Sequence, residues 1–77
     1  MALLLIYRLL SETPEEVMYA FGPSPEELTG RVVMDPREPD REATGEGDSR
    51  DLQTVAGRVT TRWLREGTWP RGGALQS

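Results

Sequence analysis

An apolar run from Leu3 to Leu10 constrains the fold of this chain more than any other feature, because no other stretch brings so many large apolar side chains together. A membrane span needs roughly 20 apolar residues, whereas this run is shorter and contains Arg8. A secretory signal would carry positive charge before its apolar segment, and here Arg8 is the first basic side chain. A short apolar run bounded by polar turn residues is typical of a strand. We therefore predict a buried strand that stays in the mature protein.

Composition narrows the functions that the chain can serve. With 77 residues, the chain is expected to form a single small domain over residues 1–77. It has no cysteine and no histidine, and its nine basic residues are all arginine. These absences exclude thiolate metal sites, histidine acid–base chemistry and lysine Schiff bases. We expect a non-catalytic protein of the cytoplasm, since disulfides are lacking, and codon usage in a GC-rich bacterium would explain the all-arginine set. The net charge of −4 argues against a protein that mainly coats nucleic acid.

Residues 14–21 permit two interpretations. Val17, Tyr19 and Phe21 alternate with other residues, and alternation of period two indicates a strand. The preceding Thr13–Glu16 segment, with a proline and two glutamates, is also typical of a helix N-terminus, and Gly22 would stop such a helix. We favour the strand, because Val, Tyr and Phe are weak helix formers and the helix would have barely two turns. The helix stays open as an alternative.

The next segments complete a small sheet. Residues 24–27 repeat the same turn chemistry and predict a single helical turn that ends near Gly30. Residues 31–35 predict a third strand, which Pro36 stops. Residues 36–48 are rich in Pro, Gly and charged side chains and predict a flexible acidic loop. Three strands joined by short connections form an antiparallel meander.

A helix is predicted for residues 49–66, followed by a stop at Gly67. Its apolar residues recur at spacings of three and four, which places them on one stripe: Leu52, Val55, Ala56, Val59 and Trp63. Trp69 is expected to fold back toward this stripe, and residues 71–77 to form a frayed tail. The predicted fold is therefore α+β with two layers, a three-stranded antiparallel meander packed against one C-terminal helix, in the order β-β-β-α.

One helix can cover only one face of this sheet. Alternation places on the helix side Leu3, Leu5, Tyr7, Leu9, Val17, Tyr19, Phe21, Val32 and Met34. It places on the other side Leu4, Ile6, Leu10, Met18, Ala20 and Val33. An exposed apolar patch of this kind usually marks an interface. We predict that it mediates a homodimer or binds an unknown protein partner. The alternative is that the loop and the tail cover it.

The predicted helix carries a second candidate contact surface. Arg58, Arg62 and Arg65 fall on one flank beside the apolar stripe, and Trp69 follows soon after. Arginines with an aromatic suit phosphate contacts and base stacking, so a nucleic-acid-binding regulator is the alternative function. The plainer interpretation is a solvated helix flank, in which Glu66 is the local ion partner of Arg62. An acidic protein partner is also open, and no membrane contact is expected.

Carboxylates are the remaining candidates for chemistry. They are Glu15, Glu16, Glu26, Glu27 and Asp35, with Tyr7 or Tyr19 as possible neighbours. Acidic residues beside turn prolines are the expected complement to a helix dipole, and no spacing here separates an acid from a base. The chain also lacks a phosphate-binding glycine loop, a nucleophile elbow and a metal-ligand pattern. We therefore predict no catalytic residue, no cofactor and no metal ligand.

Overall fold

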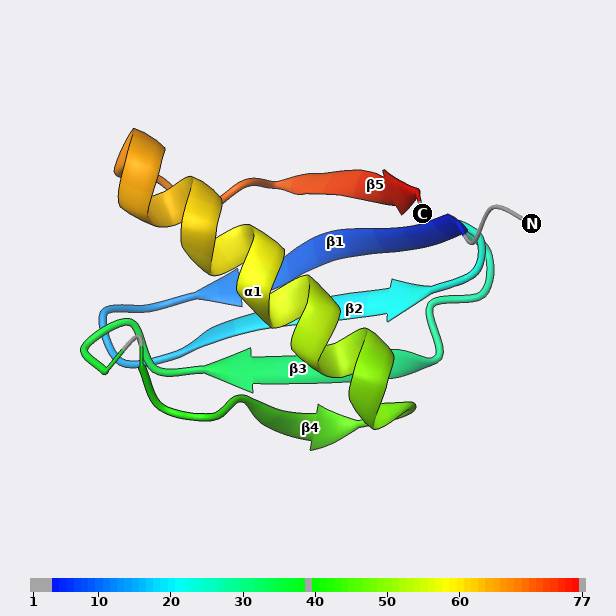
Figure 1. The fold of residues 1–77 in the computed structure, drawn as a ribbon, viewed down its shortest axis with the longest axis horizontal. Coiled ribbons are helices and arrows are strands. Elements are labelled where there is room, and N and C mark those ends of the chain that lie inside the picture. Colours follow the sequence, from blue (N-terminus) through cyan, green and yellow to red (C-terminus); the bar gives the residue numbers. More distant parts are fainter. Residues whose placement is uncertain (1–3, 39, 77) are drawn as a thin grey trace.

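A computed structural model describes residues 4–38 and 40–76 and shows an antiparallel sheet with one helix across one of its faces (Figure 1). The elements in chain order are β1 (Leu4–Glu12), β2 (Val17–Gly22), β3 (Gly30–Met34), β4 (Thr44–Glu46), α1 (Ser49–Glu66) and β5 (Gly72–Gln76). The five strands lie in the order β4-β3-β2-β1-β5, and each pairs antiparallel with its neighbours. After the meander β1 to β4, α1 crosses the sheet diagonally, so that β5 can add to the far edge beside β1 (Figure 1).

The predicted α+β class and the single helix over residues 49–66 are confirmed, but the prediction of three strands is wrong. The two further strands lie in segments for which the sequence indicated a loop and a tail. β4 forms where Thr44 pairs with Val33 at one edge of the sheet. β5 forms where Leu75 pairs with Leu5 at the other edge. Both strands depend on pairing with residues distant in sequence, which local composition does not report.

The strand interpretation of the second segment is also confirmed, because β2 occupies Val17–Gly22. The Thr13 side chain organises the turn before it, where the Thr13 Oγ1 atom accepts hydrogen bonds from the backbone N–H groups of Glu15 and Glu16. The residues that resembled a helix start therefore close a β-turn region between β1 and β2. Leu3, where the apolar run begins, lies outside the described residues.

The core lies between the sheet and α1. Its buried members are Tyr7, Val17, Tyr19, Phe21, Val32, Met34, Ala43, Leu52, Val55, Ala56, Val59 and Trp69. The helix begins at the N-cap Asp48, whose carboxylate accepts from the N–H groups of Arg50 and Asp51, and it ends at Gly67 in the left-handed conformation. Both caps satisfy terminal backbone groups that would otherwise lack partners.

Two glycines make room for core aromatic rings. Gly73 pairs with Tyr7 across β5 and β1, and a Cβ atom at Gly73 would lie 2.6 Å from the Tyr7 hydroxyl. Gly30 pairs with Phe21 in the same way, and a Cβ atom there would collide with the Phe21 ring. Real Cβ atoms do not approach so closely. Each ring therefore lies over the backbone of its cross-strand partner, where only glycine leaves space.

The segment between α1 and β5 is anchored from the core. The Trp63 and Trp69 rings stack with centroids 4.8 Å apart and planes 5° from parallel. The buried Tyr19 hydroxyl donates a hydrogen bond of 2.5 Å to the Pro70 carbonyl oxygen. Trp69 thus folds back as predicted, and these contacts direct the chain toward the edge of β1 where β5 forms.

Candidate protein interface

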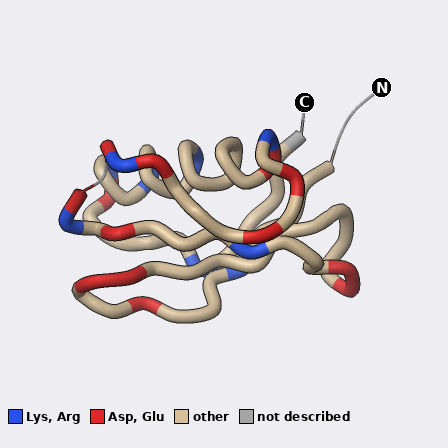
Figure 2. Tube along the Cα trace, turned by 90° about the horizontal axis from the view of Figure 1, so that it is seen from below, with Lys and Arg blue, Asp and Glu red and all other residues tan. Residues whose placement is uncertain are grey.

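The face of the sheet opposite α1, here called the outer face, carries no second layer among the described residues (Figures 1 and 2). The strand register assigns Leu4, Ile6, Met18, Ala20 and Val33 to it, as the alternation predicted. Leu4 is 45% exposed, and Ile6, Met18 and Val33 are half-buried. Ala20 is only 2% exposed, so it contributes little contact area.

Leu10 departs from the simple alternation. The pairing of β1 with β2 shifts between Leu9 and Ser11, so that Leu9 pairs with Tyr19 and Ser11 pairs with Met18. Leu10 is the extra residue of this irregularity and has no partner in the register. It is nevertheless 45% exposed, and it lies next to Ser11 at the end of the sheet where Met18 is found.

A row of charged residues divides the apolar part of the outer face. Consecutive register pairs run across the sheet from Gly72 through Arg8, Ala20, Arg31 and Glu46. Arg8, Arg31 and Glu46 are exposed. None of them takes part in an ion pair within 4.0 Å among the described residues. Figure 2 shows basic positions within the sheet layer as well as on the helix. Ile6 lies on one side of this row, and Met18 and Val33 lie on the other.

Sequence reasoning missed Arg31 as a member of this face. Arg31 has the same parity as Val33 on β3, so period-two alternation already places both side chains on one face. The outer face is consequently two apolar areas separated by two arginines, and it is not a continuous apolar patch.

Only two of the three arginines predicted on the flank of α1 are exposed in the structure. Arg58 and Arg65 are exposed, while Arg62 is half-buried and places its Nε atom 3.4 Å from the Glu66 carboxylate. The Tyr7 hydroxyl and then Glu66 raise the pKa of the Arg62 guanidinium above its usual value. With Gln53, Thr54, Gly57 and Thr61, these arginines line an open groove of about 470 Å³.

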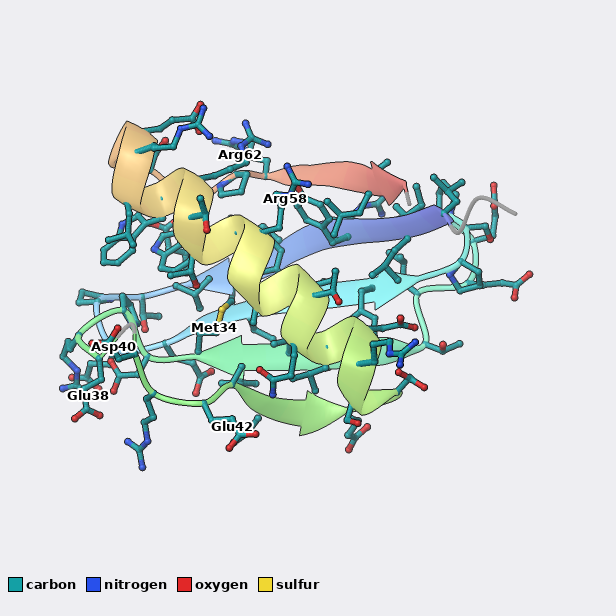
Figure 3. All side chains as sticks on the ribbon, viewed as in Figure 1. Met34, Glu38, Asp40, Glu42, Arg58 and Arg62 are labelled. Carbon is teal, nitrogen blue, oxygen red and sulfur yellow. The ribbon has the colours of Figure 1, made fainter. Side chains whose placement is uncertain are left out.

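Trp69 does not join that flank. It is only 8% exposed and stacks on Trp63 within the core, so its ring is not free to stack on a base. Figure 3 shows Arg58 and Arg62 together on the side of α1 toward β5. The structure therefore brings the three arginines together but leaves them without the aromatic partner that base stacking requires.

The acidic loop before β4 borders a cleft on the opposite side of α1. This cleft has a volume of about 320 Å³, and Glu38, Asp40 and Glu42 lie around it (Figure 3). Asp35 accepts two side-chain hydrogen bonds from Arg37, which lower the pKa of its carboxyl group to about 2. A depressed pKa keeps a carboxylate ionised, which is the opposite of what a proton donor needs.

The described residues contain no group of three or more acidic side chains placed to hold a metal ion. The remaining carboxylates predicted as candidates, Glu15, Glu16, Glu26 and Glu27, lie exposed in turns.

No helix among the described residues is both long and apolar enough to span a lipid bilayer. Comparison with known proteins gives no match to a family model, to a curated protein or to a solved structure. The function must therefore be inferred from the surface of the molecule itself.

Proposed function

We propose that this chain is a non-catalytic protein-interaction module that forms a homodimer through its outer face. The observation that carries the proposal is the set of apolar side chains which the single-layered sheet leaves open to water. Leu4 is exposed, and Met18 and Val33 are half-buried, on a face without a covering element. Association would remove this apolar surface from water, which is the main favourable contribution to most protein–protein binding.

The size of the outer face supports a dimer. The Cα atoms span 35 × 23 × 19 Å, and the sheet lies across the two longer dimensions (Figure 1). The sheet fills part of that extent, so the outer face offers at most roughly the 800 Å² per partner that a standard protein interface buries. The helix-side surface of the sheet is already occupied by α1. The outer face is thus the broad flat surface that remains.

A second copy suits the charges of this face. Arg8, Arg31 and Glu46 lie on the outer face, so a second copy presents there both apolar surface and a carboxylate for the unpaired arginines. Symmetric dimers in which one surface binds its own copy are also the commonest oligomers.

The experiment is sedimentation equilibrium of the purified chain and of two variants over a range of concentrations. We expect the wild type to dimerise. Met18→Glu would place a carboxylate in the interface of each copy and should raise the dimer Kd at least about tenfold, or about 1.4 kcal/mol. Leu64→Glu is the matched control, because Leu64 is 66% exposed on α1 and lies outside the outer face. It should leave the dimer unchanged.

Folding of both variants is checked by tryptophan fluorescence and circular dichroism, since Trp63 and Trp69 report on the opposite side of the sheet. A wild type that stays monomeric at all concentrations would refute the proposal. So would a folded Met18→Glu variant that dimerises as well as Leu64→Glu.

A further inference from the structure

We infer that the two copies associate in one particular register, in which Arg8 of each copy lies opposite Glu46 of the other. The inference rests on the proposed homodimer, and it specifies which residues face each other across the dimer interface. Its basis is the order of the charged row on the outer face: Gly72, Arg8, Ala20, Arg31 and Glu46, one residue from each strand. Neighbouring residues in this row are separated by one strand spacing, about 4.8 Å.

Arg8 and Glu46 do not meet within one copy. They lie on β1 and β4, which are three strand spacings apart, or about 14 Å. Arg31 and Glu46 are neighbours in the register, but no ion pair within 4.0 Å joins them or Arg8 to any described residue. The outer face therefore carries opposite charges that a single copy leaves uncombined.

Symmetry limits how two such rows can face each other. Sheets that pack face to face keep their strands within about 30° of parallel, so a twofold axis in the interface can run along the strands. Such an axis reverses the order of the row in the partner copy. If the axis passes between Ala20 and Arg31, then Arg8 lies opposite the partner's Glu46, and Arg31 lies opposite the partner's Ala20. Because of the twofold symmetry, the pair between Arg8 and Glu46 forms twice in the dimer.

Other positions of this axis lose the pair between Arg8 and Glu46. An axis between Arg8 and Ala20 leaves Glu46 outside the overlap of the two sheets, so neither arginine finds a carboxylate. An axis over Ala20 places Arg8 opposite the partner's Arg31, and an axis over Arg31 places that residue opposite its own copy. Like charges that face each other across an interface are unfavourable. An axis between Arg31 and Glu46 would pair those two residues, but only β3 and β4 would then overlap, and Met18 would stay exposed.

The apolar residues agree with the favoured register. The same axis, between β2 and β3, places Met18 of one copy opposite the partner's Val33, because these two residues pair in one row beside the charged row. Ala20 is small and lies between the two arginines, so it leaves space for the partner's Arg31 side chain. Charge pairing and apolar burial thus favour one arrangement.

A charge exchange tests this register. Arg8→Glu and Glu46→Arg, made singly, each turn two attractive pairs into two repulsive ones, and each should weaken the dimer about tenfold. The double variant Arg8→Glu/Glu46→Arg restores opposite charges across the interface and should recover most of the lost affinity. Added salt screens exposed charges, so it should weaken the wild-type dimer and strengthen the dimers of the two single variants.

The control is the double variant Arg31→Glu/Glu46→Arg. It keeps opposite charges at positions 31 and 46, which are neighbours within each copy, but it places a positive charge at position 46 opposite Arg8 of the other copy. It should not recover affinity. If both single variants weaken the dimer and the Arg8/Glu46 double variant does not recover, or if Arg8→Glu has no effect, this register is wrong while self-association stands. A wild type that never dimerises refutes the proposed function and this inference together.

Discussion

The hydrogen bond from Tyr19 to Pro70 makes the most direct test of how this fold is held together. The Tyr19 side chain is fully buried, and its hydroxyl donates to the carbonyl oxygen of Pro70, which is itself buried. Tyr19→Phe removes the donor and leaves that oxygen without its partner. Leaving a buried acceptor unsatisfied costs about 1 to 3 kcal/mol. We expect the free energy of unfolding at neutral pH to fall by that amount.

The same hydroxyl predicts a dependence on alkaline pH. Burial is the largest cause that raises the pKa of Tyr19 well above its ordinary value of 10.0. The unfolded chain then releases this proton at a lower pH than the folded chain does. The stability that Tyr19 contributes is therefore fully present below pH 10 and falls by about 1.4 kcal/mol for each pH unit above it. The loss continues until the folded-state pKa is reached.

This composition makes the measurement unusually clean. The chain has no lysine and no cysteine, and arginine stays charged, so tyrosine is the only side-chain type in it whose ordinary pKa lies near 10. Urea unfolding of wild type and Tyr19→Phe should show a difference that narrows by about 1.4 kcal/mol from pH 9 to 11. Tyr7→Phe is the control, because it keeps the bond from Tyr19 to Pro70. A difference between wild type and Tyr19→Phe that stays constant with pH would refute the reasoning.

Three further substitutions, one within α1 and one at each of its caps, test the local construction of the helix by urea unfolding followed by circular dichroism. Gly57→Ala should raise the free energy of unfolding by about 0.8–1 kcal/mol, because the helix gains propensity and a Cβ atom there meets nothing within 4 Å. The same substitution at Gly67 should lower it by about 1 to 2 kcal/mol, because Gly67 has a φ of 78° at the C-cap. Equal signs for the two glycines would contradict this account. Asp48→Ala should cost about 1 kcal/mol through loss of the N-cap, and a neutral result would show that water replaces it.

Local sequence signals predicted α1 well, because each of them acts within a few residues. The stripe of Leu52, Val55 and Val59 and the stop at Gly67 are all present in the structure. The alternation in β2 likewise identified the strand against its helical alternative, because Tyr19 and Phe21 are buried on one face. In these elements, local pattern and tertiary packing favour the same structure.

The edge strands β4 and β5 were not predictable in this way, because the features that make them strands are contacts with residues of another strand. Gly73 suggests a flexible tail when it is considered alone, whereas in the fold its missing side chain makes room for the Tyr7 ring. β4 contains no large apolar side chain, and its three residues are all exposed. Only the pairing with β3 identifies it as a strand. The pairing of Gly73 with Tyr7 joins opposite ends of the chain, and β4 pairs with β3 across the whole loop that separates them, so the local composition of either segment does not reveal its partner.

Only part of the outer face was predicted, because its composition depends on how separate strands align. Alternation gave the correct side for Met18, Ala20 and Val33. It also placed Leu10 on this face, but in the structure the irregularity between Leu9 and Ser11 leaves Leu10 without a partner in the register. The row through Arg8, Ala20 and Arg31 depends on how three strands align, and this alignment follows from turn geometry, so hydropathy alone does not reveal it.

The two edges of the sheet explain why the outer face, and no strand edge, is the surface proposed for self-association. β4 has three residues and carries Glu46, so it offers few backbone hydrogen bonds to an incoming strand. β5 has five residues, but two of them are glycine, and pairing along this edge would bury little apolar surface. Edge pairing would also leave the apolar side chains of the outer face in water. A twofold contact through the outer face would cover those side chains. Each copy would then have no outer face left for a third copy, so the assembly would close as a dimer. The charge exchange between Arg8 and Glu46 is sensitive to this arrangement, since edge pairing through β5 would leave Glu46 at the opposite side of the sheet.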